Sequence, residues 1–174
     1  FKSIADTAGE NIDVYIDFSV PSAAYENIKA VCELKKPLVM GTTGWYDKKS
    51  EVEKMVKDAG IGFIYSTNFS LGVNIFFKIL ETAAQIIDKF DIYDVFGYEL
   101  HHNKKVDSPA GTAKTIAQIL VDNITRKRTI YYDKLDRKPE ATELHFASIR
   151  GGAIPGTHIV CFDSEVDTIE FKHT

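Results

Sequence analysis

Short apolar segments alternate with amphipathic segments along the first part of the chain. The segments Ile12–Phe18, Leu38–Met40 and Ile61–Tyr65 predict strands, and the first is apolar enough to predict a strand buried in a parallel sheet. Between them, apolar residues recur every three or four positions, which indicates two helices with one buried face each. These faces contain Ala24, Ile28, Val31 and Cys32, and then Val52, Met55, Val56 and Ala59. The alternation of strands and helices is typical of a parallel sheet with right-handed crossovers.

Capping residues predict where these two helices begin and end. Ser19 is a suitable N-cap with Pro21 in the first turn, and Asp47 is a suitable cap for the second helix. Pro37 stops the first helix, and Gly60 ends the second. The segment before the first strand, residues 1–11, shows no clear element, so we expect the chain to be a fragment or the ordered part of a longer protein.

The pattern changes in the second part of the chain. Leu71–Phe90 is the longest amphipathic segment and predicts a helix that covers a sheet. Residues from Tyr93 alternate up to Glu99 as in a strand, and Pro109 requires the next helix to begin between Ser108 and Thr112. Strands then follow one another directly, which predicts a mixed or antiparallel sheet and hence a second domain. These strands are Thr129–Tyr132, a weaker candidate, Thr142–Ile149, His158–Phe162 and Val166–Phe171.

The segment from Tyr98 to Ala113, Y-E-L-H-H-N-K-K-V-D-S-P-A-G-T-A, carries more chemistry than a connecting loop requires. Gly111 and Thr112 open the predicted helix, whose unpaired N–H groups suit a carboxylate or phosphate. Lys104 or Lys105 supplies the full positive charge that such an anion needs. His101 and His102 point to opposite faces if the strand continues that far, so one is a candidate proton donor and the other a candidate ligand contact.

Simpler interpretations of this segment exist. A single loop histidine is usually a solvated side chain, and a pair of lysines is usually a solvated surface, but their combination within sixteen residues favours a site. A metal site is disfavoured, because adjacent strand residues diverge and the segment offers no cysteine or further histidine at ligand spacing. We therefore expect no metal.

Polar residues follow each predicted strand of the first domain. In a parallel sheet these ends lie at one edge, where ligands bind, so three such ends indicate a cleft. A G-x-G-x-x-G fingerprint for dinucleotides is absent from the sequence. The three strand ends are Asp17-Phe18-Ser19, Gly41-Thr42-Thr43 and Ser66-Thr67-Asn68-Phe69.

The composition of the chain limits the classes of binding partner that can be expected. Net charge is −4 and the pI is near 5.7, which gives no reason to expect binding to nucleic acid or an anionic membrane. No apolar run is long enough for a membrane span. Cys32 and Cys161 fall in core patterns without a C-x-x-C motif, as expected for reduced cysteines of a cytoplasmic protein.

The segment E-L-H-H-N-K-K-V-D-S-P-A-G-T-A resembles the signature of the dihydrodipicolinate reductase family, E-x-H-H-x-x-K-x-D-x-P-S-G-T-A. Ala110 stands where the family usually has serine. V-Y-I-D-F-S, G-T-T-G, N-F-S-L-G-V-N and the R-x-G-x-I-x-G-x-H pattern from Arg150 to His158 extend the resemblance over nearly the whole chain. The resemblance implies an enzyme that uses NADH or NADPH to reduce dihydrodipicolinate (4-hydroxy-tetrahydrodipicolinate) to tetrahydrodipicolinate, in the diaminopimelate route of lysine biosynthesis.

The resemblance also implies roles for residues. His101 would donate or accept the proton and Lys105 would be its catalytic partner, while His102, Gly111 and Thr112 would contact the dicarboxylate substrate. The nicotinamide end of the cofactor would be lined by Gly41, Thr42, Thr43, Ser66, Thr67, Asn68 and Phe69. Family members are homotetramers assembled through the sheet of the second domain.

The resulting fold prediction is α/β. Residues 1–70 form a partial, Rossmann-like dinucleotide-binding domain that lacks its first strand–helix unit, and residues 71–174 form an α+β substrate and oligomerisation domain with a mixed sheet. Two other functions stay open at this point. One is a non-catalytic module that binds anions or assembles, and the other is a related amino-acid dehydrogenase, which the His-His-x-x-Lys spacing disfavours.

Overall fold

A computed structural model describes residues 3–174 of the chain. Phe1 and Lys2, part of the segment for which the sequence predicts no element, lie outside the described residues. The rest of that segment contains one short 3₁₀-helix, η1 (Ala5–Thr7). The chain divides into two compact units, Phe1–Phe69 and Ser70–Thr174.

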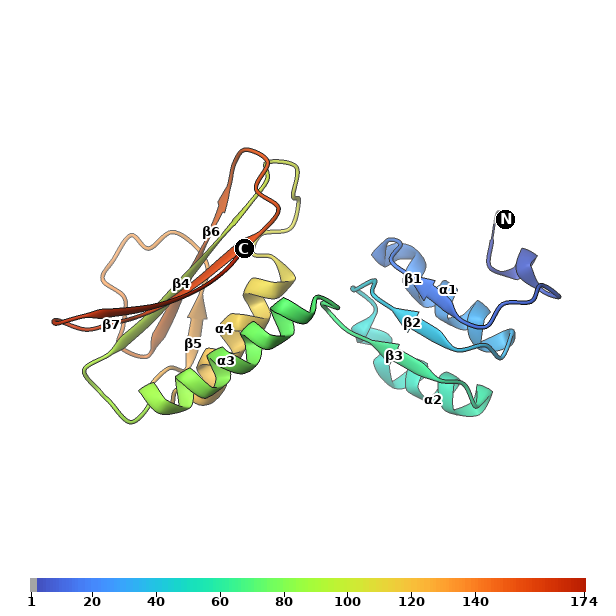
Figure 1. Ribbon diagram of the computed structural model, residues 1–174, viewed down its shortest axis with the longest axis horizontal. Coiled ribbons are helices and arrows are strands. Elements are labelled where there is room, and N and C mark those ends of the chain that lie inside the picture. The colour runs from blue at the N-terminus through green and yellow to red at the C-terminus, as the bar shows by residue number, and fades with distance from the viewer. Residues whose placement is uncertain (1–2) are drawn as a thin grey trace. The chain divides into compact units, whose positions relative to one another are not determined.

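The first unit contains a three-stranded parallel sheet in the order β1-β2-β3 (Figure 1). Its elements in chain order are β1 (Tyr15–Asp17), α1 (Pro21–Glu33), β2 (Leu38–Met40), η2 (Tyr46–Lys48), α2 (Lys49–Ala59) and β3 (Phe63–Tyr65). The predicted α1 face, from Ala24 to Cys32, is buried and packs with Val52 and Trp45. This arrangement confirms the predicted alternation of strands and helices.

Two local predictions for this unit are wrong. Residue Val20, not Ser19, is the N-cap of α1, because the Ser19 hydroxyl donates to Asp17 instead. Asp47 lies inside η2 and makes no capping bond to α2. The predicted end of α2 is correct, since Gly60 adopts the left-handed conformation with φ 67° and its N–H reaches back to the helix.

The first strand is less buried than its apolar sequence predicts. Ile16 is 66% exposed and Phe18 65% exposed, while Asp17, between them, is buried. Strand β1 is at the edge of the sheet, so one side of it has no neighbouring strand among the described residues. The prediction of a strand buried on both faces is therefore wrong for the chain as described.

The second unit is a five-stranded mixed sheet in the order β5-β6-β4-β7-β8. Strand β4 is parallel to β6 and antiparallel to β7, as the succession of strands predicts. The elements are α3 (Leu71–Ile87), β4 (Asp94–His101), α4 (Gly111–Asn123), β5 (Thr129–Tyr131), β6 (Glu143–Arg150), β7 (Thr157–Asp163) and β8 (Thr168–His173).

Helices α3 and α4 lie side by side along one face of this sheet (Figure 1). The predicted apolar faces of both helices form a core with β4, β6 and β7 that includes Leu80, Ile116, Leu120, Phe146 and Phe162. Ser70 caps α3 by accepting a hydrogen bond from the N–H of Val73. Helix α4 begins at Gly111, within the range that Pro109 permits.

Two predictions on composition can be compared with the structure. Cys32 and Cys161 are buried and free, as expected for reduced core cysteines. Within the described residues, every helix is too short or too polar to span a lipid bilayer.

Candidate functional site

The last residues of β4 place the predicted catalytic segment on the sheet face that carries α3 and α4. Alternate residues of β4, from Val95 through Gly97 and Glu99 to His101, are buried on this face. The register sets Glu99 opposite Ser148 of β6 and His158 of β7, and His101 opposite Arg150 of β6. Residues about fifty positions apart in the sequence therefore meet at one end of β4.

Glu99 is the centre of this group, and its side chain is fully buried. Its Oε1 atom accepts hydrogen bonds from the Ala110 N–H at 2.8 Å, the Ser148 hydroxyl at 2.8 Å and Arg150 Nη2 at 2.9 Å. Burial by itself raises the pKa of a carboxyl group, but these donors outweigh it and hold the pKa of Glu99 below its ordinary value. Glu99 is thus a buried carboxylate at neutral pH.

The other oxygen of Glu99 faces two histidines. His101 Nδ1 lies 2.7 Å from Glu99 Oε2, and His158 Nε2 lies 3.6 Å from the same oxygen. The Nδ1–H bond is not aimed straight at Oε2, so the close His101 contact is electrostatic rather than a linear hydrogen bond. The two imidazole rings meet edge to face, with centroids 5.3 Å apart.

Both of these histidines are neutral at neutral pH. Burial lowers the pKa of His101, and the positive charges of Lys105 and Arg150 lower it further, against the opposing effect of Glu99. Burial lowers the pKa of His158 to about 4. The pKa of His101 therefore lies below the unperturbed value of a histidine, with burial as the main cause.

The second nitrogen of His101 lies beside a glycine. A Cβ atom at residue 156 would lie 2.9 Å from His101 Nε2, and Gly156 has φ +151°, which disfavours side chains. Gly156 therefore permits the imidazole to lie close to the loop that joins β6 to β7.

Lys105 lies in the loop after β4 and is bound to a neighbour. Its Nζ atom is 2.8 Å from Asp107 Oδ1, and its side chain is 24% exposed. Burial opposes ionisation of Asp107, but Lys105 outweighs it and lowers the pKa of that carboxyl group. Arg150 Nη2 donates to the Asp107 carbonyl oxygen at 2.7 Å and so ties this loop to the Glu99 group. Lys104 is exposed.

The remaining predicted substrate contacts lie around the same loop. Strand β4 ends at His101, so His102 is outside it, and its N–H donates to the Ile154 carbonyl at 2.8 Å. Gly111 is the first residue of α4, and a Cβ atom there would have no neighbour within 4 Å. The first turn of a helix directs N–H groups outward, so Gly111 and Thr112 present this end of α4 to the surface.

The predicted cofactor residues lie at the carboxyl ends of the first unit's strands. Asp17 accepts hydrogen bonds from the Thr42 hydroxyl at 2.6 Å, from the Ser19 N–H at 2.9 Å and from Asn27 at 2.6 Å. Thr42 is 6% exposed, and both its hydroxyl, which donates to Asp17, and its carbonyl oxygen, which accepts from Trp45 Nε1 at 2.9 Å, are engaged within the unit. A hollow of ≈200 Å³ lies beside this network and is lined by Phe18, Ser19, Pro21, Gly41, Thr42 and Thr43.

Two aromatic rings and a glycine shape this edge. The rings of Phe18 and Phe69 meet edge to face at 5.9 Å, which brings the segment after β3 to the segment after β1. A Cβ atom at Gly41 would lie 2.1 Å from the Phe18 ring, so glycine is required for the ring to lie there. Ser66 Oγ donates to the Asn68 carbonyl at 2.7 Å and folds the segment back on itself. Thr67 is exposed between them, and Thr43 is exposed after Gly41.

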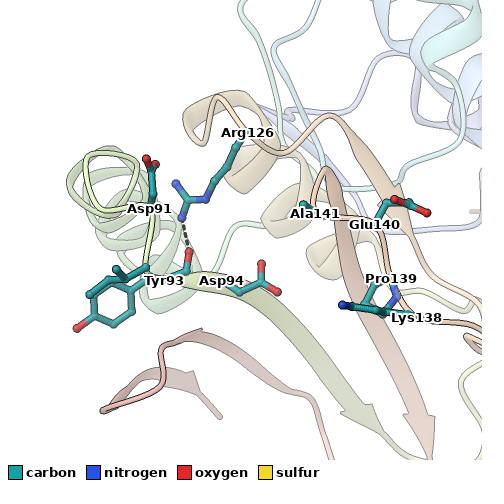
Figure 2. Close-up of a pocket in the computed structure, with 9 residues that line it drawn as sticks. Asp91, Tyr93, Asp94, Arg126, Lys138, Pro139, Glu140 and Ala141 are labelled. Carbon is teal, nitrogen blue, oxygen red and sulfur yellow. Dashed lines mark hydrogen bonds between the residues drawn. The ribbon is translucent and has the colours of Figure 1, made fainter.

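A larger hollow, of ≈610 Å³, lies at the other end of β4 (Figure 2). Arg126 donates to the Tyr93 carbonyl there, and Asp91, Asp94 and Glu140 also line the hollow. None of the residues predicted from the sequence as site residues is among its lining residues. Three carboxylates line it together with Arg126 and Lys138, so the hollow has no excess of positive charge for an anionic substrate.

The sequence did not single out four residues of the site, namely Glu99, Ser148, Arg150 and His158. Glu99 had a readable signal, since an acidic residue interrupts an apolar alternation immediately before the two histidines. Arg150 and His158 stood out only as the ends of a glycine-rich loop. The sequence offers no further histidine at ligand spacing near His101 and His102. The fold nevertheless brings His158, which is distant in the sequence, next to His101.

Comparison with known proteins identifies the family. The family model "Dihydrodipicolinate reductase, N-terminus" matches residues 1–69, and "Dihydrodipicolinate reductase, C-terminus" matches residues 72–174. A two-unit α/β chain with this site is thereby assigned to a class of reductases. The chain belongs to the dihydrodipicolinate reductase family.

Curated relatives agree with this assignment. The 4-hydroxy-tetrahydrodipicolinate reductase of Christiangramia forsetii is 40% identical over 163 residues, which cover 94% of this chain and 66% of the relative. That of Methanocaldococcus jannaschii is 37% identical over 166 residues, covering 92% of this chain and 59% of the relative. The chain thus spans less than two thirds of the length of these relatives.

A solved structure supports the fold. Dihydrodipicolinate reductase from Paenisporosarcina sp. TG-14, described with dipicolinate bound, matches with a TM-score of 0.73 and 20% identity. The match covers 99% of this chain and 66% of that chain. At this identity the comparison establishes the fold of the chain.

Proposed function

We propose that the protein to which this chain belongs reduces dihydrodipicolinate to tetrahydrodipicolinate with NADH or NADPH, in the diaminopimelate route of lysine biosynthesis. The observation that carries the proposal is the pairing of a buried histidine, His101, at the end of β4 with a nearby ammonium group, Lys105, in the loop that leads to α4. This combination supplies a proton and binds an anion at one place. The names of the curated relatives point to the same reaction.

The first unit contributes the nicotinamide end of the cofactor site, which includes Gly41, Thr42, Thr43, Ser66, Thr67, Asn68 and Phe69. When bound, the nicotinamide supplies the hydride. The residues fit this role, because a side chain at Gly41 would collide with Phe18, and the hollow beside it is lined by Phe18, Pro21 and the small residues Ser19, Gly41, Thr42 and Thr43. These features suit a flat, polar ring laid against the strand ends.

The second unit binds the dicarboxylate. Lys105 supplies the positive charge, while His102 and the backbone of Gly111 and Thr112 supply hydrogen bonds. Lys105 is held by Asp107 here, so a substrate carboxylate has to compete with or join this pair. The dipicolinate bound to the Paenisporosarcina reductase is a compound of the same dianionic class.

His101 delivers the proton. Its pKa is lowered by burial and by Lys105 and Arg150, so the free protein holds it neutral at pH 7. A bound dianion reverses part of this effect, because two negative charges beside Lys105 favour the imidazolium. Substrate binding therefore prepares His101 as an acid at the place where the proton is needed.

The protein is a cytoplasmic homotetramer in this proposal. The face of the five-stranded sheet opposite α3 and α4 carries exposed apolar residues, with Phe96 39% exposed and Ile149 52% exposed. The strand register places Phe96 and Leu100 on the same face, with Ile149 opposite Leu100. An apolar sheet face of this kind is suited to pack against another copy. The two free, buried cysteines are consistent with a reducing compartment.

The proposal is tested on the complete protein by matched substitutions at adjacent lysines. The oxidation of NADH or NADPH is followed with dihydrodipicolinate as substrate. Lys105→Ala should raise KM and lower kcat together, since binding and positioning are both lost. Lys104→Ala, which removes an exposed neighbour of equal charge, should leave both constants within about twofold.

Two other outcomes would contradict the proposal. A protein that phosphate stabilises against heat, but that binds neither NADH nor NADPH, would be a non-catalytic anion-binding module. A protein that oxidises an amino acid with NAD or NADP, but does not turn over dihydrodipicolinate, would be a related dehydrogenase.

A further inference from the structure

The two carboxylate oxygens of Glu99 contact different groups. Oε1 receives three donors, from Ala110, Ser148 and Arg150, and Oε2 faces His101 and His158. A carboxylate that is 0% exposed is costly to bury, and the three donors on one oxygen offset that cost. They also fix the plane of the carboxylate, so Oε2 has a defined position.

Of the two histidines that Oε2 faces, only His101 lies within hydrogen-bond distance of this oxygen. Oε2 is 2.7 Å from His101 Nδ1 but 3.6 Å from His158 Nε2. On its other side the His101 ring meets Gly156, where a Cβ atom would lie 2.9 Å from Nε2. The ring is therefore held between a fixed carboxylate at Nδ1 and a glycine at Nε2.

We propose that Glu99 is a positioning residue for His101: it keeps a proton on Nδ1 and stabilises the imidazolium, so that Nε2 is the nitrogen that delivers the catalytic proton. The inference rests on the proposed reduction and deepens it. A neutral imidazole has one N–H, and the partner that one nitrogen faces decides which nitrogen carries it. Because the Glu99 carboxylate lies 2.7 Å from Nδ1 and its charge favours a proton on that nitrogen, Nε2 is free to take up and release the second proton.

The proton balance of the step is simple. A hydride adds two electrons and one hydrogen to one end of the substrate double bond, and the nicotinamide becomes oxidised. The other end takes the proton from Nε2 of the His101 imidazolium, which returns to the neutral ring with its proton on Nδ1. Water restores the Nε2 proton. Glu99 remains a carboxylate throughout and exchanges no proton.

Charged or titratable groups from β4, β6, β7 and the loop after β4 face His101. Glu99, on the same strand, favours the imidazolium, while Arg150 of β6 and Lys105 of the following loop oppose it. His158 of β7 lies against the ring and is itself neutral. In this part of the described chain, Glu99 is thus the negative charge that offsets the effect of Arg150 and Lys105 on the protonation of His101. Without Glu99, both cations would disfavour the imidazolium with no opposing charge.

A metal ion is the other occupant that these atoms suggest. Glu99, His101 and His158 offer ligand atoms within 4.8 Å of one another. Two ligands of a tetrahedral zinc with bonds of ~2.0–2.1 Å lie about 3.3 Å apart, whereas Oε2 and Nδ1 are 2.7 Å apart, a hydrogen-bond distance. Arg150, 2.9 Å from the same carboxylate, also repels a cation. The short separation of Oε2 from Nδ1 and the nearby Arg150 favour a protonated Nδ1 beside the carboxylate over a metal ion.

The first experiment needs neither a variant nor activity. Nitrogen-15 NMR of the imidazole nitrogens in the complete protein reports which one carries the proton. We expect His101 as the Nδ1–H tautomer at neutral pH, and His101→Asn identifies its signals. An Nε2–H tautomer in the wild type would overturn the proposal.

The second experiment compares Glu99→Gln with Glu165→Gln, the same loss of charge at an exposed carboxylate in the segment between β7 and β8. Glu99→Gln keeps the shape and removes the charge, so kcat should fall at least ~10-fold with KM changed much less, and the alkaline limb of the kcat profile should move to lower pH. Glu165→Gln should shift neither. Glu99→Asp, which keeps the charge, should recover part of the loss.

Each result decides one question. A folded Glu99→Gln variant with wild-type kcat and pH profile would refute the positioning role. Zinc that raises the melting temperature of the wild type but not of Glu99→Gln would show a metal site and would also refute it. If the wild-type protein does not reduce dihydrodipicolinate, the proposed function fails, and the NMR tautomer still decides the role of Glu99.

Discussion

Gly97 lies in the middle of β4, the strand that carries Glu99 and His101, and an alanine there has a calculable cost. A Cβ atom at this position would lie 2.4 Å and 2.7 Å from two ring carbons of Phe146 and 3.0 Å from the Ile159 carbonyl oxygen. Phe146 is 0% exposed, so its ring has no open space into which to move. We expect Gly97→Ala to destabilise the second unit.

The magnitude follows from two opposing effects. Overpacking of a closely packed core costs ~1–3 kcal/mol. Replacing glycine by alanine returns ~0.4–1 kcal/mol, because the unfolded chain loses freedom. The net loss therefore lies between about 0 and 2.6 kcal/mol, with a midpoint near 1.3 kcal/mol, and each kcal/mol lowers the melting temperature of a domain of about 100 residues by ~4–8 °C.

The assay is thermal unfolding of the complete protein, followed by circular dichroism and calorimetry, with two comparisons. Gly151→Ala is the control, because a Cβ atom there meets nothing within 4 Å and the melting temperature should stay the same or rise slightly. Phe146→Leu, which removes the ring, should make Gly97→Ala less costly in the double variant, with a coupling of ~0.5–3 kcal/mol. Equal melting temperatures for Gly97→Ala and the wild type, or strictly additive effects, would refute the reasoning.

Two further predictions concern the first unit. Asp17→Ala should destabilise it by ~1.5–3 kcal/mol in urea unfolding, since Thr42, Ser19 and Asn27 lose a charged acceptor. Burial opposes ionisation of Asp17, but its hydrogen-bond donors hold the pKa of this carboxyl group below the ordinary value. Wild-type Asp17 therefore stabilises the unit above pH ~4, and this stabilisation is lost as the pH falls through the lowered pKa. An acid-unfolding curve unchanged by Asp17→Asn would contradict this. Gly41→Ala should displace the exposed Phe18 ring and change the free energy of unfolding by less than ~0.5 kcal/mol. It should also weaken the binding of NADH or NADPH in a fluorescence titration. Unchanged binding would show that this edge does not hold the nicotinamide.

The regular elements were predictable because each has a strong local signal. Helix α3 carries a continuous apolar stripe, Gly60 ends α2 in the left-handed conformation, and Pro109 limits where α4 begins. The caps Ser19 and Asp47 were mispredicted, because a hydroxyl or carboxylate has several possible partners and the sequence does not show which is nearest. Ser19 is engaged by Asp17, two residues away.

The site was predictable only where its residues are close in sequence. His101, His102 and Lys105 stand within one loop segment, so their proximity follows from the chain itself. The contacts of Glu99 with Arg150 and His158 depend on the register of β4 against β6 and β7, which a sequence pattern does not give. The lowered pKa of His101 depends on the burial that this register produces.

The most direct test of the central claim compares His101→Ala with His102→Ala in the complete protein, by steady-state kinetics of dihydrodipicolinate reduction across pH. Wild-type kcat should fall as pH rises through the pKa of His101. His101→Ala should lower kcat by ~10²–10⁴-fold with KM changed much less, and the deficit should shrink as pH falls and solvent supplies protons. His102→Ala should mainly raise KM. Near-normal turnover in His101→Ala with turnover lost in His102→Ala would reverse the two roles, and normal kinetics in both would place the chemistry elsewhere and contradict the claim.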